Sequence, residues 1–216
     1  MLTTCWSVKG GSGTTVVAAG VALVRAKQHR QAPPVLLVDL GGDAPAVLGM
    51  PEPAAPGVAD WLNSDAPVSA LDDLALGVVD HLALVPRGYG PLPDLISPRW
   101  SAMAAALRDR PGDAVIDCGP LRPGPQVLTD EALSVLVLRP CYLALRRIAG
   151  HSLTADRVVL IDEPGRALRR PDVEHVVGRR VDAHLDLDPA IARAVDAGLL
   201  AGRLPMQLSN GLRRVA

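Results

Sequence analysis

The sequence has few cysteines and no cysteine pair. Cys5, Cys118 and Cys141 are odd in number and widely spaced, and none belongs to a Cys-x-x-Cys motif. This pattern argues against a disulfide framework or a zinc site, so we expect a reducing compartment. The chain also lacks a run of about twenty apolar residues, and Lys9 and three glycines interrupt its N-terminus, which has no charged leader. We therefore expect a cytoplasmic protein without stable membrane insertion.

Lysine is almost absent as well. Lys9 and Lys27 are the only lysines, and arginine supplies the other cationic side chains. In so lysine-poor a chain, Lys9 is less easily explained as an incidental surface charge. The five histidines show no metal-ligand spacing. The formal net charge of -1 gives no general indication of a nucleic-acid-binding protein.

The length and composition suit one domain over residues 1–216, because 216 residues with 49% hydrophobic content can bury a sheet between helices. Short apolar or β-branched runs predict strands at residues 3–8, 35–39, 81–85, 114–117, 134–138, 157–161 and 181–185. Helical spacing predicts helices at residues 14–29, 98–109, 142–149 and 189–200. The alternation predicts an α/β fold with a doubly wound, mostly parallel sheet flanked by helices. Ligands of such a fold bind at the carboxyl ends of the strands.

The strongest motif is a glycine-rich turn between the first strand and the first helix, KGGSGTT at residues 9–15. Its three glycines let successive amides point at a common centre, and the following helix adds its positive end, so the turn predicts a phosphate site. In the usual P-loop pattern a lysine reaches the β- and γ-phosphates and the next hydroxyl binds magnesium. Thr14 stands at that lysine position and Thr15 at the magnesium position. The alternative interpretation is a purely structural glycine turn.

The KGGSGTT segment resembles the deviant Walker A signature KGGxGKT of the ParA/MinD family of P-loop ATPases. Further segments are similar in order and spacing over nearly the whole chain. They are VLLVDLGGD from Val35 for switch I, LALVPRGYG from Leu82 for the strand with a proline-glycine turn, AVIDCGP from Ala114 for switch II, LSVLVLRPCYLALRRI from Leu133 for the next strand and helix, and the segment from Val181 through DPAIARAVDAG for the late strand, turn and helix.

The resemblance implies a P-loop NTPase fold that binds ATP or ADP with Mg²⁺ and forms a homodimer. It gives catalytic roles to Lys9, which matches the family lysine that reaches the partner's phosphates, and to Asp39 in switch I. It implies nucleotide contacts from Lys9, Gly10, Gly11, Ser12, Gly13, Thr14, Thr15 and Val16. It implies Mg²⁺ contacts from Thr15, Asp39 and Asp117. Asp117 has an alternative interpretation as a residue that caps the turn after a buried strand.

Two departures from the family pattern concern hydrolysis. The loop lysine is replaced by Thr14, and Gly41 stands where the family has the second switch I aspartate, which orients the attacking water. Asp43 follows two residues later, but a glycine-glycine step gives it no fixed position. Phosphoryl transfer depends on positioning and on charge neutralisation, so we predict weak nucleotide binding and weak or absent ATPase activity.

The resemblance leaves three functional hypotheses. The first is a pseudo-ATPase that dimerises and recruits a protein partner, positioning a machine for chromosome partition, division-site selection or pilus and secretion assembly, as the CpaE/TadZ type does. The second is an active partition ATPase with nonspecific DNA binding, and the third is a nucleotide-free structural interaction module. DNA contact is not favoured, because the arginine pairs are most simply solvated surface: Arg146 and Arg147, Arg169 and Arg170, Arg179 and Arg180, Arg213 and Arg214.

The C-terminal tail, residues 198–216, occupies the place of the membrane-targeting helix of MinD-like proteins. A membrane anchor needs a continuous apolar face. We expect Pro205 and Gly211 to break such a helix, so that the tail docks on its own domain.

Overall fold

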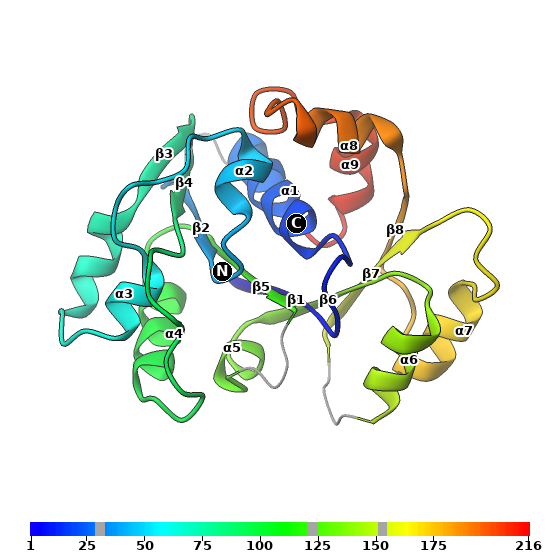
Figure 1. Cartoon of the computed structure of the whole chain (residues 1–216), viewed down its shortest axis with the longest axis horizontal. Coiled ribbons are helices and arrows are strands. Elements are labelled where there is room, and N and C mark those ends of the chain that lie inside the picture. The colour runs from blue at the N-terminus through cyan, green and yellow to red at the C-terminus, as the bar shows by residue number, and fades with distance from the viewer. Residues whose placement is uncertain (29–32, 121–124, 151–154) are drawn as a thin grey trace.

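The computed structural model describes residues 1–28, 33–120, 125–150 and 155–216, which fold around an eight-stranded sheet (Figure 1). Its order is β3-β4-β2-β5-β1-β6-β7-β8. Only the pairing of β3 with β4 is antiparallel among the pairs within this described sheet. The strands are β1 (Leu2–Ser7), β2 (Val35–Asp39), β3 (Leu76–Val79), β4 (Leu82–Val85), β5 (Ala114–Pro120), β6 (Leu133–Leu138), β7 (Arg157–Asp162) and β8 (Ala183–Asp186).

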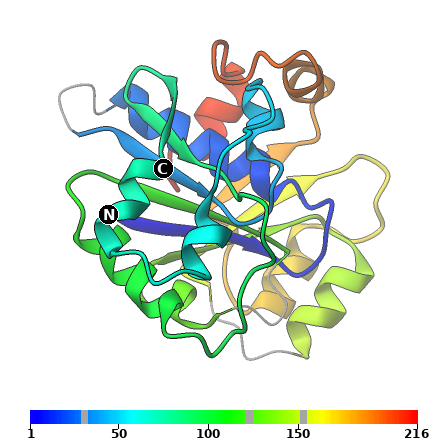
Figure 2. The ribbon, with the colours of Figure 1, turned by 60° about the vertical axis from the view of Figure 1, so that its left-hand side comes forward.

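Helices cover both faces of the sheet, as Figure 2 shows from the side. One face is covered by α1 (Thr14–Gln28), α2 (Ala44–Leu48), α8 (Pro189–Asp196) and α9 (Met206–Leu212). The other is covered by α3 (Val58–Leu62), the 3₁₀ helix η1 (Val68–Leu74), α4 (Arg99–Asp109), α5 (Val127–Asp130), α6 (Tyr142–Ala149) and α7 (Arg170–Val177).

Strand β2 shows why the sheet needs two helical layers. Leu36 and Val38 pack into the core under α3 and α4, whereas Val35 and Leu37 pack into the core under α1. Successive side chains of a strand point to opposite faces, so an uninterrupted apolar run must be buried on both. The VLLV run therefore fixes β2 as an interior strand.

The structure confirms the predicted fold class, the seven predicted strands and the helices that correspond to α1, α4, α6 and α8. The predicted end of the first helix, at residue 29, lies outside the described residues. The prediction of a helix to residue 200 is wrong, because α8 ends before Gly198, whose φ of 65° belongs to the left-handed region. Strand β3 and several short helices were not predicted, because they are too short to show a period.

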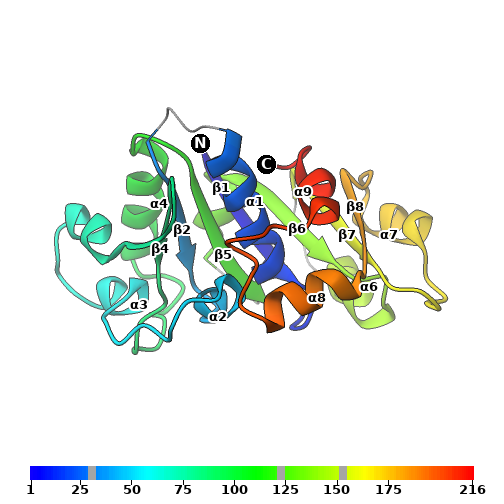
Figure 3. The ribbon, with the colours of Figure 1, turned by 90° about the horizontal axis from the view of Figure 1, so that it is seen from above.

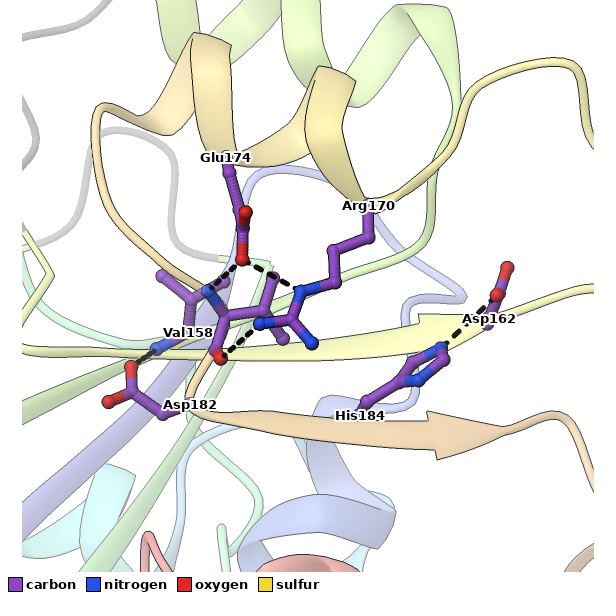
Figure 4. Close-up of polar contacts among 7 residues, drawn as sticks. Val158, Asp162, Arg170, Glu174, Asp182 and His184 are labelled. Carbon is purple, nitrogen blue, oxygen red and sulfur yellow. Dashed lines mark hydrogen bonds and ion pairs between the residues drawn. The ribbon is translucent and has the colours of Figure 1, made fainter.

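Side-chain hydrogen bonds hold the segment that leads into β8 against α7 and β7 (Figure 4). The Oε1 atom of Glu174 accepts from Nε of Arg170 at 2.8 Å and from the amide of Val181 at 2.9 Å. The carboxylate of Asp182 accepts from the amide of Val158 at 2.8 Å. These bonds set the approach of the chain into β8 and so place the loop that follows it.

The C-terminal tail docks on its own domain, as expected. Helix α9 lies against α1 and β8, and the side chains of Leu208, Leu212 and Val215 are buried there. The expectation that Gly211 would break a helix is wrong, because it lies inside α9. Its bare Cα lets α9 approach β8 so closely that a Cβ would overlap Leu185. No helix among the described residues is both long enough and apolar enough to cross a bilayer.

Substitution at Gly211 tests this close approach. We expect Gly211→Val to lower the free energy of unfolding by about 1–3 kcal/mol, because overpacking displaces Leu185 or lifts α9. Urea unfolding measures the change, and Gly202→Val in the same tail is the control. The nearest atom to a Cβ at Gly202 is 4.0 Å away, so this change should stay within about 0.5 kcal/mol. Equal losses in the two variants would contradict the proposed packing of α9.

Candidate functional site

The loop between β1 and α1 curls at the carboxyl end of the sheet, where Figure 3 also places α2 and α8. Gly11 and Gly13 have φ angles of 74° and 86°, which glycine adopts without strain. The hydroxyls of Ser7 and Ser12 both donate to the carbonyl of Lys9, each at 2.9 Å. Two serines therefore hold the loop in its curled form.

The inner side of the loop presents amides without acceptors. In the described chain, no hydrogen bond is donated by the amides of Gly10, Gly11 or Gly13. The first amides of α1, which begins at Thr14, have no acceptor within their own helix. A Cβ at Gly10 or Gly11 would meet no atom within 4 Å, so the loop is open there. Free amides beside a helix N-terminus form an anion site.

No cationic side chain of the loop occupies this anion site. The ammonium of Lys9 bends back and donates to the carbonyl of Gly10 at 3.0 Å. Thr14, at the usual lysine position, is 5% exposed. The loop therefore offers an anion its backbone and the helix end but no positive side chain of its own.

Two buried carboxylates lie side by side next to this loop. Asp39 ends β2 and pairs in register with Asp117 of β5, and both are fully buried. Asp39 accepts through Oδ1 from the amide of Gly42 at 2.7 Å and through Oδ2 from the amide of Ala44 at 2.9 Å. Asp117 accepts through Oδ1 from the amide of Gly119 at 2.9 Å, but its Oδ2 has no partner among the described residues.

Burial governs the protonation of these two carboxyls. It raises the pKa of Asp117 to about 6, against the opposing effects of the Thr15 hydroxyl and the Gly119 amide. Burial also raises the pKa of Asp39, although the backbone amides that it accepts from oppose the change. An unpartnered carboxylate oxygen beside a threonine hydroxyl and an anion site provides the hard oxygen ligands that Mg²⁺ prefers.

The protein supplies only part of such a metal site. Within the described segments, no group of three or more His, Cys, Asp or Glu side chains is arranged to hold a metal ion. Asp117 and Thr15 fit Mg²⁺ only when other oxygens, such as those of phosphate groups, complete the shell. The residues present therefore fit a metal that enters together with an anionic ligand.

Gly41 lies directly over the two carboxylates. A Cβ there would be 3.5 Å from Oδ2 of Asp117 and 3.5 Å from Oδ1 of Asp39. A side chain at this position would thus point at both carboxylates. Asp43 is exposed at the start of α2, and its charge contributes to the raised pKa of both Asp39 and Asp117.

A cavity of about 240 Å³ opens beside the loop, on the α1 side of the sheet. A Cβ at Gly13 would be 2.7 Å from Cδ1 of Ile161, so glycine keeps the loop clear of the cavity wall. The wall is mostly apolar and includes one arginine. Its residues are Gly13, Val16, Val17, Arg139, Ile161, Leu185, Asp186, Leu187, Asp188, Ile191, Ala192, Val195, Asp196 and Leu208.

Comparison with solved structures identifies the fold. A ParA family ATPase from Chlorobium tepidum matches with a TM-score of 0.77 at 19% identity over 98% of this chain and 95% of its own. The MinC:MinD cell division protein complex from Aquifex aeolicus gives 0.75 at 16% identity over 99% and 94%. MinD from Pyrococcus horikoshii, complexed with Mg-ADP, gives 0.72 at 18% identity over 99% and 96%. The chain has the ParA/MinD fold. No protein-family model and no curated protein sequence matches it.

Within this ParA/MinD fold, the predicted site residues gather at the carboxyl ends of β1, β2 and β5. The residues from Lys9 to Val16 run from the loop after β1 into the first turn of α1, and Val16 also lines the cavity. Asp39 and Asp117 lie beside them, with Thr15 close enough to influence Asp117. The exception is the side chain of Lys9, which turns back on its own loop.

Sequence reasoning missed how the loop after β2 is held by the segment that follows β4. A guanidinium nitrogen of Arg87 donates to the carbonyl of Leu40. The loop that carries Arg87 is held in turn by Asp60, whose carboxylate accepts from the amides of Tyr89 at 3.1 Å and Gly90 at 3.2 Å. The segment LALVPRGYG stood out as family-like, but no pattern within it assigned a contact to its arginine.

The raised pKa of Asp117 predicts a pH dependence of stability in the absence of magnesium. Below pH 4 the carboxyl is protonated in both states, whereas between pH 4 and 6 the unfolded chain ionises first. The free energy of unfolding should therefore fall as pH rises through this range, by about 1.4 kcal/mol for each pH unit and roughly 3 kcal/mol in all. The Asp117→Asn variant has no ionisable group at this position. The free energy of unfolding of the wild type should therefore fall relative to that of the variant between pH 4 and 7.

Urea unfolding at several pH values measures this difference. Met206→Leu, which alters an exposed side chain that does not titrate, is the control. Its stability difference from the wild type should stay constant with pH. A constant difference for Asp117→Asn as well would refute the raised pKa.

Proposed function

We propose that this protein is a ParA/MinD-like nucleotide-binding protein with weak or absent ATPase activity that dimerises and positions a cellular machine. One observation carries the proposal. The loop amides have no acceptor among the described residues and Oδ2 of Asp117 has no partner there, at neighbouring strand ends. A nucleotide with bound magnesium supplies phosphate groups for the loop amides and a cation for Oδ2 of Asp117.

The described residues divide the binding task between them. The amides of residues 10–13 and the start of α1 receive phosphate oxygens, while Thr15 and Asp117 hold Mg²⁺, which would neutralise phosphate charge. The carboxylate of Asp39 fixes the following turn through two amides. The apolar cavity beside Gly13 suits a nucleobase.

The same geometry supports slow hydrolysis. Thr14 gives no charge to the transferred phosphoryl group, and Gly41 gives no carboxylate to orient water above Asp39 and Asp117. One missing electrostatic donor typically costs roughly 3 to 4 kcal/mol of transition-state stabilisation. Two such losses favour a protein that uses nucleotide as a structural ligand.

The positioning role rests on the fold and on the neighbouring structures. They include a MinD cell division protein in complex with MinC, and a plasmid partition protein bound to AMPPNP. We extend the protein-partner and dimer roles to this chain as part of the proposal. Lys9, partly exposed on the loop face, is then the residue that reaches a second copy.

An active partition ATPase with DNA binding is less well supported. Three arginine pairs each place one member against the protein itself. Arg147 donates to the carbonyl of Val8 at 3.2 Å, Arg170 pairs with Glu174, and Arg179 donates to the carbonyl of Asp156. Guanidinium groups used in this way contribute less to a phosphate-binding surface.

Calorimetric titration with Mg-ADP tests the proposal. We expect measurable binding that weakens at least tenfold without magnesium, and Asp117→Asn should lose this magnesium effect because it removes the free carboxylate oxygen. Asp109→Asn, which removes an exposed carboxylate on α4, is the control and should keep the magnesium effect. No heat at millimolar nucleotide would instead support a nucleotide-free interaction module. Light scattering on the same samples reports whether the mass doubles with ligand.

Restoring the two missing side chains tests the catalytic part. The double variant Thr14→Lys, Gly41→Asp should release phosphate from Mg-ATP at least tenfold faster than the wild type, because position 41 already points at both carboxylates. Each single variant should gain less. Rapid turnover by the wild type that disappears in Lys9→Ala would overturn the pseudo-ATPase proposal.

A further inference from the structure

Arg139 follows β6, the strand that pairs with β1 on the side away from β5. Adjacent strands lie about 4.8 Å apart, so the backbone of Arg139 is about one strand spacing from the strand that enters the loop. Arg139 lines the same cavity as Gly13. Arg139 is therefore the basic residue of the cavity wall, and it lies on the strand next to the loop.

The guanidinium of Arg139 has unused donors. Its Nε is buried and has no partner in the described chain. Its Nη1 lies 4.0 Å from Oε2 of Glu163, which is beyond hydrogen-bonding distance. That same carboxylate oxygen accepts from Arg166 at 2.7 Å and 2.9 Å, so its stronger bonds go elsewhere. Buried donors without acceptors are costly, and an anion entering the cavity would remove that cost.

The charges of the cavity wall favour one orientation of an anionic ligand. Asp186 ends β8 and Asp196 ends α8, and Asp188 is the N-cap of α8, where its carboxylate accepts from the amide of Ala190. Strand β8 is three strands from β1 in the sheet order, or about 14 Å. Phosphate groups are repelled from that side and attracted to the loop and Arg139. Hydrogen-bond donors of a sugar or base suit the aspartate side.

We infer that Arg139 binds the phosphate groups of the nucleotide and supplies, within the same chain, the positive charge that the loop lacks at Thr14. This inference rests on the proposed nucleotide-binding function. It names a binding residue that lies outside the loop motif. The guanidinium exchanges its weak pairing with Glu163 for charge-assisted hydrogen bonds to phosphate oxygens.

Mg-ADP titration of Arg139→Gln tests the inference, with Arg166→Gln as the matched control. Both variants remove a guanidinium that faces Glu163, but Arg166 does not line the cavity. We expect the dissociation constant to rise at least tenfold in Arg139→Gln and to stay within twofold in Arg166→Gln. Raising the salt concentration should weaken the wild type more than Arg139→Gln, because only the wild type has this charge contact.

The outcomes separate the inference from the proposed function. Wild-type protein that binds no Mg-ADP defeats the proposed function, and the inference with it. Wild-type binding that Arg139→Gln leaves unchanged, or a tenfold loss without the salt effect, defeats the inference alone. Urea unfolding without nucleotide checks that each variant folds. If Arg139→Gln does not fold, Arg139→Lys replaces it in the titration. Because lysine cannot form the paired hydrogen bonds of a guanidinium, the inference requires Arg139→Lys to bind Mg-ADP several-fold more weakly than the wild type.

Discussion

The curled loop between β1 and α1 is the feature on which the functional interpretation depends. Within the described residues its amides have no acceptors, and the nearby Oδ2 of Asp117 has no donor. The amides of Gly10 and Gly11 are exposed, whereas Oδ2 of Asp117 is buried. An unsatisfied buried polar atom destabilises a folded chain, so the packing around Asp117 must offset that cost. Strand β1 lies between β5 and β6, and α1 packs over the sheet with most of its residues buried. The core thus places the loop amides and the unpaired carboxylate oxygen at neighbouring strand ends.

The surroundings fix the loop from several directions. Ser7 and Ser12 hold its backbone from within, and Arg147 of α6 donates to the carbonyl of Val8 from the other face of the sheet. Glycine at position 13 keeps the loop clear of Ile161. Because these contacts involve the backbone, the shape of the anion site does not depend on the side chain at position 14. This explains how the loop takes its curled form with a threonine at position 14.

The sequence predicts the interior of this fold better than its edges. Strands β2 and β7 carry apolar runs that only a sheet covered on both faces can bury, so the sequence predicts them as interior strands. Strand β3 is a half-exposed edge strand of four residues, and its alternation is too short to recognise. The loop motif and the two strand-end aspartates are local patterns. The cavity and Arg139 are not, because the wall combines segments that meet only in the folded chain.

The two departures from the family pattern are electrostatically linked. An aspartate at position 41 would add a third carboxylate within reach of Asp39 and Asp117, whose pKa values burial already raises. A lysine at position 14 would offset that charge, since opposite charges in a poorly solvated site favour each other's ionised form. Losing only the lysine would leave an uncompensated negative charge, and losing only the aspartate would leave an uncompensated positive one. The combination of Thr14 and Gly41 keeps the local charge balanced, because it adds neither a positive nor a negative side chain beside the two buried carboxyls.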